Sequence, residues 1–240
     1  RIARELESIG FEVTGGVGTT GVVAILRNGD GPLVMMRADM DGLPVQERAS
    51  LPYASKVFQE NSEGKVFPVM HACGHDVHMT SLIGTARRMV ASKDTWSGTL
   101  MLVAQPAEEW KISGAKAMRE DRIWERFGKP DYALAFHVAA DIEAGKLFAP
   151  RNAAYSAVDS LDVIVPGIGA HGASPHRGRD PIVIASQIVL ALQTLVSREL
   201  SPREPGVVTV GVFKAGNKRN VIGELARLEL TVRSDNESTR

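Results

Sequence analysis

The apolar positions of the 240-residue chain fall into short runs separated by Gly- and Pro-rich turns. In the first part of the chain these runs predict strands over residues 11–13, 21–26, 33–37, 100–104 and 132–137. The last two runs are continuously apolar, which is typical of buried strands, and we expect 100–104 to pair in parallel. Apolar residues at helical spacing predict helices over 79–91 and 115–122. Residues 51–68 are polar and irregular, and we expect a surface excursion there.

The second part of the chain shows a different order of elements. Residues 160–165 alternate apolar and polar, which predicts a half-exposed strand, and Pro181 opens a predicted helix over 182–196. Strands are expected over 207–213 and 224–231, and residues 234–240 are typical of a helix start. This order is most of a split βαβ, ferredoxin-like unit. We therefore expect two domains, 1–157 and 158–240, in a chain that is a fragment cut at both ends.

Composition narrows the classes of partner. Lys plus Arg and Asp plus Glu both number 28, so no net charge favours nucleic acid or an acidic membrane surface. We expect no apolar run to be long enough to span a bilayer, and we expect neither nucleic-acid nor membrane partners. The single cysteine excludes an internal disulfide framework and fits a reducing compartment, so we expect a cytoplasmic location.

The stretch over residues 70–80 is the richest in chemistry, because it holds the only cysteine and three of the six histidines. Cys73 and His75 are two residues apart, so an extended backbone would point both to one side, and Gly74 permits a tight turn. Thiolate and imidazole together suit zinc, manganese or a similar ion. This pair alone does not distinguish a metal site from a buried cysteine beside surface histidines. We expect His78 to support a metal ligand or to cap the following helix rather than to bind the metal itself.

Further ligand-type side chains follow the predicted strands. Asp39 and Asp41 come after residues 33–37, and we interpret Asp39 as a carboxylate that orients a ligand imidazole and Asp41 as an ordinary acidic turn. Glu108 and Glu109 follow the buried run 100–104, where two carboxylates are costly unless they are paired or bound to metal. Their side chains should point in different directions, so that one can bind the metal and the other can reach a water molecule that the metal activates. His137 closes another strand, and we expect four side chains to converge at one sheet edge, namely Cys73, His75, Glu109 and His137.

Six motifs occur in one order along nearly the whole chain. They are RADMDGLP at 37–44, HACGHDVH at 71–78, QPAEE at 105–109, FHV at 136–138, AHGASPH at 170–176 and NVI at 220–222. As a set they resemble the aminoacylase–hippurate hydrolase branch of the di-metal aminopeptidase/carboxypeptidase G superfamily, which includes the auxin-conjugate amidohydrolases. The resemblance implies a three-layer α/β, aminopeptidase-like catalytic domain with an inserted α+β ferredoxin-like lid and dimerisation domain, incomplete in this chain.

The resemblance also implies a chemistry and a set of roles. It implies a metal-dependent amidohydrolase that acts on N-acyl amino acids or related small amides. The implied cofactor is one or two divalent ions, with zinc or manganese preferred and cobalt or nickel as alternatives. The implied oligomer is a homodimer formed through the lid. The implied metal ligands are Cys73, His75, Glu109 and His137. Glu108 matches the general base, Asp39 the orienting aspartate, His171 a histidine that stabilises the tetrahedral intermediate, and Asn220 a lid asparagine near the substrate.

The sequence departs from the family pattern at three places. The family's last metal ligand is a histidine in the C-terminal part of the catalytic domain, and no histidine follows His176 here. Trp110 stands where the family usually has glycine, which is expected to narrow the acyl pocket. Gly223 replaces a proline after the NVI motif, which is expected to loosen that loop.

Two other functions stay open. The first is a cysteine hydrolase with Cys73 as nucleophile and His75 or His137 as base. The second is a non-catalytic module that binds metal or oligomerises. A chelator set against a thiol alkylator separates the metal-dependent enzyme from the cysteine hydrolase.

Overall fold

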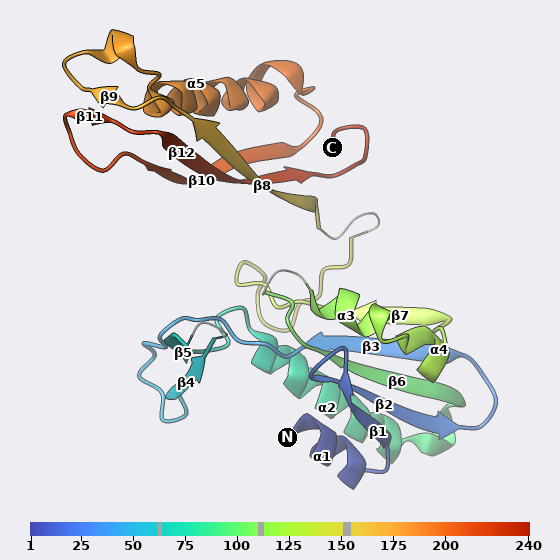
Figure 1. Ribbon diagram of the computed structural model, residues 1–240. Helices are drawn as coiled ribbons and strands as arrows, with labels where there is room; N and C mark the ends of the chain where they lie inside the picture. Colours follow the sequence, from blue (N-terminus) through green and yellow to red (C-terminus); the bar gives the residue numbers. More distant parts are fainter. Residues whose placement is uncertain (62–63, 110–112, 151–154) are drawn as a thin grey trace. The chain divides into compact units, whose positions relative to one another are not determined.

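The computed structural model describes residues 1–61, 64–109, 113–150 and 155–240. The chain divides into two compact units, Arg1–Glu143 and Ala144–Arg240 (Figure 1). The assignment of residues 1–157 as a catalytic domain and 158–240 as a lid stays a prediction.

The first unit is a mixed α/β arrangement around a five-stranded sheet. Its helices and strands are α1 Ile2–Ser8, β1 Glu12–Val17, β2 Gly21–Asn28, β3 Leu33–Asp39, β4 Val57–Glu60, β5 Val66–Val69, α2 His75–Ala91, the short 3₁₀ helix η1 Lys93–Thr95, β6 Gly98–Gln105, α3 Gly114–Glu120, α4 Ile123–Phe127 and β7 Tyr132–Ala135. The strand order in the sheet is β1-β2-β6-β3-β7. Strand β3 runs parallel to both β6 and β7, whereas β2 is antiparallel to β1 and β6.

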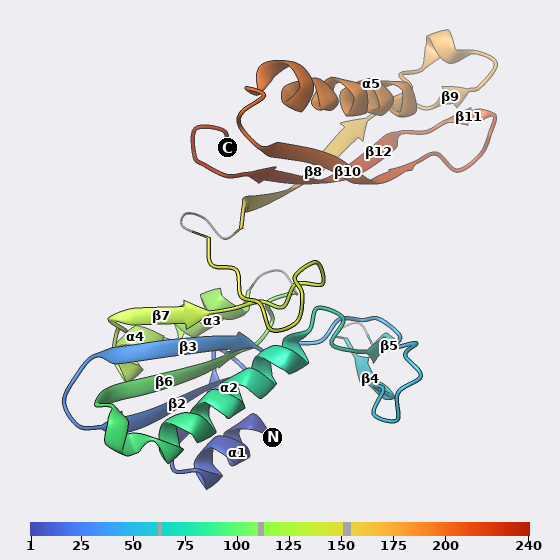
Figure 2. The ribbon, with the colours of Figure 1, turned by 180° about the vertical axis from the view of Figure 1, so that it is seen from behind.

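Alternation along the central strands places apolar side chains on both faces of this sheet. On one face Ala24 and Leu102 pack with Leu82 of α2 in a cluster that also includes α1. On the other face Ile25 and Met101 pack in a cluster with α3 and α4. Figures 1 and 2 show these helices on opposite sides of the sheet. The predicted three-layer α/β fold is therefore confirmed for this unit.

Three details of the first unit differ from the sequence expectations. Helix α2 begins at His75, four residues before the predicted start, because Gly74 adopts a left-handed conformation with φ of 75° and turns the chain directly into the helix. Strand β7 was expected to be buried and to reach His137, but it ends at Ala135 and all four of its residues are exposed. It lies at the edge of the sheet, and neither apolar cluster of this unit includes any of its residues. The excursion at 51–68 was expected to be irregular but contains the antiparallel pair β4 and β5.

The second unit joins one helix to a three-stranded antiparallel sheet. Its elements are β8 Ala157–Pro166, β9 Ala170–His171, the 3₁₀ helix η2 Pro175–Arg177, α5 Pro181–Thr194, the π-helical turn η3 Leu195–Glu199, β10 Gly206–Ala215, β11 Val221–Ile222 and β12 Leu225–Ser234. The sheet order is β10-β12-β8, so the last of the three strands lies between the other two. Ala185 of α5 packs against Leu228 of β12 and Val165 of β8. This is the predicted strand–helix–strand–strand order of a split βαβ unit.

Helix α5 corrects one sequence expectation. The segment Pro181–Glu199 has a mean hydropathy of 1.4, so by length and composition alone it is apolar enough to cross a membrane. Its inner face, which includes Ile184, Ile188 and Leu192, packs on the three-stranded sheet. A helix that covers one face of a sheet needs such an apolar stripe. Only 11% of the most apolar window of the helix is buried, however, so packing on the sheet explains only part of its composition. The expectation of no membrane partner stays a prediction.

Candidate metal centre

The ligand-type side chains of the first unit gather at one edge of its sheet. Because β3, β6 and β7 are parallel, their carboxyl ends lie at the same edge. The chain leaves β3 at Asp39, passes Glu108 and Glu109 after β6, and reaches His137 after β7. The start of α2 brings His75 to the same place. This edge is where the sequence predicted a metal site.

The distances among these groups are short enough for a common cation. Cys73 Sγ lies 3.4 Å from His137 Nε2, and ligand atoms of Cys73, His75 and His137 all lie within 4.8 Å of one another. Ligand atoms of His75, Glu108 and Glu109 also lie within 4.8 Å of one another, with His75 Nε2 at 3.9 Å from Glu109 Oε1. His75 is therefore the side chain that the two groups share.

Within the part of the chain that the structure describes, one ring nitrogen of His75 has no hydrogen-bond partner. Its Nδ1 lies 3.0 Å from the backbone carbonyl oxygen of Asp41, and Nδ1–H donates there in the neutral ring. The lone pair is then on Nε2, which is buried and has no hydrogen-bond partner among the described residues. A buried polar atom left without a partner costs free energy, and a cation at this position removes that cost. The residues present therefore fit a divalent metal ion.

His137 shows the same division between its two ring nitrogens. Its Nδ1 lies 2.7 Å from the carbonyl oxygen of Val138, while its Nε2 faces the thiol of Cys73. Hydrogen bonding of the outer nitrogen to a carbonyl is the usual way in which proteins fix a ligand imidazole. His75 and His137 thus both present Nε2 to the same space.

Asp41 is the residue that sequence reasoning missed. The chain was expected to make an ordinary acidic turn there, but the carbonyl of Asp41 contacts both His75 and His71. Its side-chain Oδ2 also accepts the backbone N–H of Glu109 at 2.9 Å, and its Oδ1 lies 3.2 Å from His75 Nδ1. Spacing places the Asp41 side chain on the same side of an extended chain as Asp39, but it does not indicate that the backbone carbonyl of Asp41 contacts the two histidines.

Asp39 makes its hydrogen bonds elsewhere. Its Oδ1 lies 2.5 Å from His78 Nδ1, and its Oδ2 accepts from Arg37 at 2.7 Å, while His75 Nε2 is 3.7 Å away. Burial works to raise the pKa of this carboxyl, but the hydrogen bond from His78 and the positive charge of Arg37 outweigh it, so the pKa lies below 3.8. Asp39 is thus an ionised carboxylate, and the contact to the outer nitrogen of His75 is made by Asp41. The orienting role of Asp39 stays a prediction.

The thiol of Cys73 is held in its protonated form in the absence of a cation. Burial raises its pKa, a hydrogen bond with Glu109 raises it further, and the charges of Glu109, Glu108 and Asp39 add to the effect, to a value of about 11. A positive ion among these groups reverses this preference, because a coordinating thiol is deprotonated. The thiol and its anionic neighbours therefore form a site that a bound cation would stabilise.

The loop that carries the glutamate pair has a constrained backbone. Ala107 has a φ of +47°, in the left-handed region that side chains rarely adopt. Its carbonyl accepts the N–H of Gly114, and Gly114 approaches the backbone of Pro106 so closely that a Cβ there would clash. This geometry fixes the direction in which Glu108 and Glu109 leave β6. The expected narrowing of the acyl pocket by Trp110 lies outside the described residues.

The two remaining predicted site residues lie together in the second unit. Strands β9 and β11 pair His171 with Val221, and Gly172 N–H donates to the carbonyl oxygen of Asn220 at 2.8 Å. His171 Nδ1 accepts from the N–H of Ala173, so in the neutral ring Nε2–H is free to donate outward. The approach of His171 and Asn220 to the metal ligands stays a prediction.

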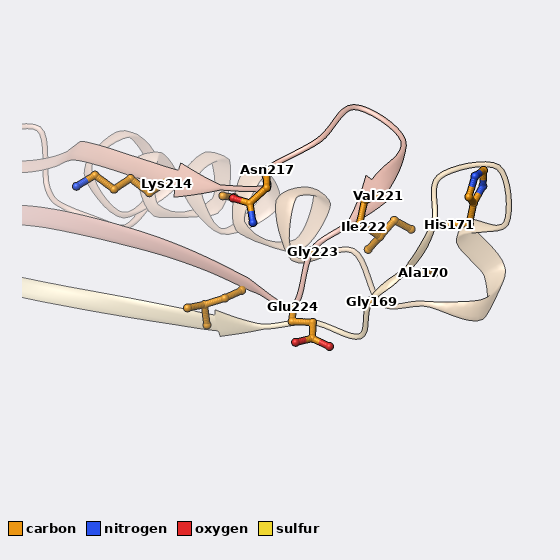
Figure 3. A pocket seen from close by; sticks show the side chains of 12 residues that line it. Gly169, Ala170, His171, Lys214, Asn217, Val221, Ile222, Gly223 and Glu224 are labelled. Atoms are coloured by element: carbon orange, nitrogen blue, oxygen red, sulfur yellow. The ribbon is translucent and has the colours of Figure 1, made fainter.

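A pocket of about 920 Å³ adjoins this part of the second unit. Figure 3 shows His171 at one end of it and Lys214 toward the other, with Asn217 and Glu224 between them. The walls therefore combine one imidazole, one amine, one amide and one carboxylate. The other eight residues that line the pocket are glycine, alanine or aliphatic residues, so the pocket is mostly apolar with a few polar groups.

Comparison with known proteins is consistent with a metal-binding site of this geometry. Residues 35–226 match the family model described as peptidase family M20/M25/M40. The chain belongs to peptidase family M20/M25/M40. Over its whole length this M20-family chain is 41% identical to the hippurate hydrolase of Campylobacter jejuni and 36% identical to the N-acetyl-L-cysteine deacetylase of Bacillus subtilis. It spans 59% and 55% of those two proteins, and so less than two thirds of either.

Two solved structures have the same fold. A structure described as an aminohydrolase from methicillin-resistant Staphylococcus aureus matches 99% of this chain with a TM-score of 0.84 and 35% identity, over 60% of its own length. A Bacillus subtilis structure described as a dinuclear metal-binding peptidase of the M20 family matches the whole chain with a TM-score of 0.75 and 32% identity, over 58% of its own length. The mixed α/β fold of this chain is therefore that of M20 structures.

Proposed function

We propose that this protein is a metal-dependent amidohydrolase that cleaves the amide bond of N-acyl amino acids or related small amides. The observation that carries the proposal is the buried Nε2 of His75, which lacks a hydrogen-bond partner in the described part of the chain and lies among the ligand atoms of Cys73, Glu109 and His137. A hippurate hydrolase, an N-acetyl-L-cysteine deacetylase and an auxin-conjugate (IAA-amino acid) hydrolase are among its relatives, which supports an N-acyl amino acid as substrate.

Four side chains of this chain would hold the ion, namely Cys73, His75, Glu109 and His137. One thiolate and two imidazoles favour zinc, manganese would suit the carboxylates, and cobalt or nickel are alternatives. The proposed site takes one or two ions. No histidine follows His176, so a further histidine ligand of the family type would not come from the rest of this sequence.

A bound divalent ion would supply Lewis acidity, which lowers the pKa of water toward neutrality and polarises the amide carbonyl. Glu108 lies in the same group of ligand atoms as His75 and Glu109, so its carboxylate is within reach of the attacking water. It would take one proton from the water as the new C–O bond forms. It would return that proton to the nitrogen as the C–N bond breaks, which releases the acid and the amine.

His171 and Asn220 would complete the site from the second unit. The hydrogen bond from Ala173 N–H to His171 Nδ1 leaves Nε2–H as a donor, which is the form needed to stabilise an oxyanion. Asn220 offers an amide that both donates and accepts, which suits the polar end of an acyl amino acid.

The proposed enzyme is a homodimer formed through the second unit. Strand β8 is an edge strand of ten residues, and it exposes Leu161 and Ile164 by 49% and 54%. On α5, Leu190 is 70% exposed. A long, partly apolar edge strand beside an apolar helix surface supports self-association. Sedimentation equilibrium of the purified protein tests it, and a monomer at micromolar concentration would count against it.

The chemistry of Cys73 disfavours the cysteine-hydrolase alternative. A catalytic thiol needs a lowered pKa so that thiolate is present near neutral pH. Burial and the neighbouring carboxylates instead raise the pKa of Cys73 to about 11. The thiol suits a metal ligand better than a nucleophile.

A substrate panel tests the proposed function. The protein is purified, stripped with a chelator, and assayed with N-acyl amino acids before and after zinc or manganese is restored. Hydrolysis that is lost on chelation and regained with metal supports the proposal. Hydrolysis that persists without metal and is abolished by a thiol alkylator would support the cysteine mechanism, and metal binding without hydrolysis would support a non-catalytic module.

A further inference from the structure

A buried chain of hydrogen bonds lies beside the proposed metal ligands. The backbone N–H of Val138 donates to His78 Nε2 at 3.0 Å, and His78 Nδ1 donates to Asp39 Oδ1 at 2.5 Å. Arg37 then donates from Nη1 to Asp39 Oδ2 and from Nε to Gln105 Oε1. We call this chain the His78 relay. It joins α2, β3, the end of β6 and the segment that follows β7.

Asp39 and His78, together with His75, also resemble a second cation site. Ligand atoms of Asp39, His75 and His78 lie within 4.8 Å of one another, and all three side chains are buried. For His78 to bind a cation it needs a ring nitrogen with a free lone pair. Its Nδ1 carries the hydrogen shared with Asp39, and its Nε2 lone pair already accepts from Val138. Both oxygens of Asp39 also accept hydrogen bonds, so coordination by His78 would break the relay.

His78 contacts both the ring of His137 and the backbone next to it. Val138 directly follows His137 in the chain, so the hydrogen bond to His78 fixes the backbone that carries this ligand. The His78 ring lies 4.6 Å from the His137 ring and 5.3 Å from the His75 ring, measured between centroids. His78 itself has no exposed surface. It is therefore packed against both proposed histidine ligands while its own nitrogens are used elsewhere.

We propose that His78 is a positioning residue and not a metal ligand: as a neutral ring protonated on Nδ1, it holds His137 in place for metal binding. Asp39 selects the tautomer, because its Oδ2 accepts from Arg37 and its Oδ1 is the hydrogen-bond partner of His78 Nδ1, which therefore carries the proton. Nε2 is then the acceptor that anchors Val138. The effect on metal affinity rests on the proposed function. The tautomer and the anchoring of Val138 belong to the fold alone and are independent of it.

Two substitutions at His78 separate the two ends of the relay. In His78→Asn the side-chain amide can still donate to Asp39 but does not reach Val138. In His78→Gln the amide oxygen can reach the position of Nε2 and accept from Val138. Leu82→Val is the matched control, because Leu82 is equally buried on α2 one turn further along and takes no part in the relay. The control removes packing from the same helix and leaves every hydrogen bond in place.

The first measurement is ¹H–¹⁵N correlation NMR of the metal-free protein, which reports on the histidine ring nitrogens and on the backbone amides. We expect His78 to be neutral with its proton on Nδ1, and the amide of Val138 to exchange slowly in wild type, in Leu82→Val and in His78→Gln. In His78→Asn the Val138 amide is expected to lose its protection. A proton on Nε2 of His78, or an equally protected Val138 amide in His78→Asn, would overturn the proposal whether or not the protein binds metal or hydrolyses amides.

The second measurement is zinc titration of the same four proteins. We expect His78→Asn to bind zinc about 10- to 100-fold more weakly with unchanged stoichiometry, as loss of a supporting group does. His78→Gln should recover most of the affinity, and Leu82→Val should match wild type. Loss of a whole zinc equivalent in His78→Asn would make His78 a ligand and overturn the proposal, and so would unchanged affinity. Absence of zinc binding in wild type would instead count against the proposed function, and the NMR result would still decide the tautomer.

Discussion

His75 Nδ1 lies 3.0 Å from the backbone carbonyl oxygen of Asp41. This contact turns the opposite nitrogen of His75 toward Glu109, whose own backbone N–H donates to the Asp41 side chain. One residue thus positions a histidine and a glutamate that come from different elements. It does so with its backbone for the histidine and its carboxylate for the glutamate.

Replacement of Asp41 by alanine is therefore expected to weaken metal binding. The substitution leaves the partly buried N–H of Glu109 without an acceptor, which costs about 1–3 kcal/mol of unfolding free energy. Zinc affinity should fall about 10- to 100-fold, as it does when a supporting contact of a metal ligand is lost. Calorimetric zinc titration and urea unfolding measure the two effects. Asp94→Ala, at an exposed position of η1, is the control, and equal zinc affinity in the two variants would refute the role of Asp41.

Glu108→Gln is expected to bind metal normally and to lose turnover. The amide keeps the size of the side chain but cannot accept a proton from water, and loss of a general base typically lowers the rate by about 10²- to 10⁴-fold. Steady-state hydrolysis of an N-acyl amino acid and metal analysis of the same sample measure both properties. Glu125→Gln, exposed on α4, should leave both unchanged. Full activity of Glu108→Gln would remove this residue from the mechanism.

Cys73 is expected to react slowly with alkylating reagents in the metal-free protein. Its pKa is raised from 9.0 to about 11, so the thiolate fraction near neutral pH is roughly 100-fold smaller than for an ordinary thiol. A raised pKa in the folded state gives a contribution to stability that is complete below pH 9.0 and is lost as the pH rises toward 11. The alkylation rate should accordingly climb through that same interval.

A pH series of iodoacetamide labelling, with a small-molecule thiol measured in parallel, tests the expectation for Cys73. Urea denaturation of the folded protein before labelling should restore the ordinary rate. Rapid labelling of the folded, metal-free protein at pH 7 would show a low pKa and would revive the cysteine-hydrolase alternative.

Ala107 offers a test of the loop that carries the glutamates. Its φ of +47° is strained for any residue with a Cβ, and most strained for a β-branched one. Ala107→Gly should leave stability within about 1 kcal/mol of wild type, because relief of strain offsets the greater freedom of glycine in the unfolded chain. Ala107→Val should lower the unfolding free energy by about 1–2 kcal/mol and reduce turnover.

Urea unfolding and hydrolysis assays measure both Ala107 variants. Ala54→Val, at a turn alanine that does not have a positive φ, should change neither quantity by much. Equal stability of the glycine and valine variants at position 107 would show that the backbone there is not constrained.

The layers of the fold and the place of the metal site were predictable from local patterns. Alternating and continuous apolar runs identified the central strands, and the coincidence of Glu109 and His137 at strand ends indicated where ligands would meet. Both signals are local, since burial of a strand imposes its own periodicity. The same logic gave the strand–helix–strand–strand order of the second unit.

The contacts of Asp39, Asp41 and His78 were not predictable from spacing alone. Which nitrogen of His75 faces a carbonyl depends on where α2 begins, and that start was set by the left-handed conformation of Gly74. An apolar run also does not reveal that β7 lies exposed at the edge of the sheet. Long-range order of this kind is determined by tertiary packing and not by a window of sequence.

The central claim is that Cys73, His75, Glu109 and His137 hold one divalent cation. X-ray absorption spectroscopy of the zinc-loaded protein tests it most directly, because sulfur and nitrogen or oxygen ligands have distinct bond lengths. We expect one sulfur at about 2.3 Å together with nitrogen and oxygen ligands at about 2.0–2.2 Å, and the sulfur to disappear in Cys73→Ser. A zinc shell without sulfur in the wild-type protein, or the same shell in both proteins, would contradict the account.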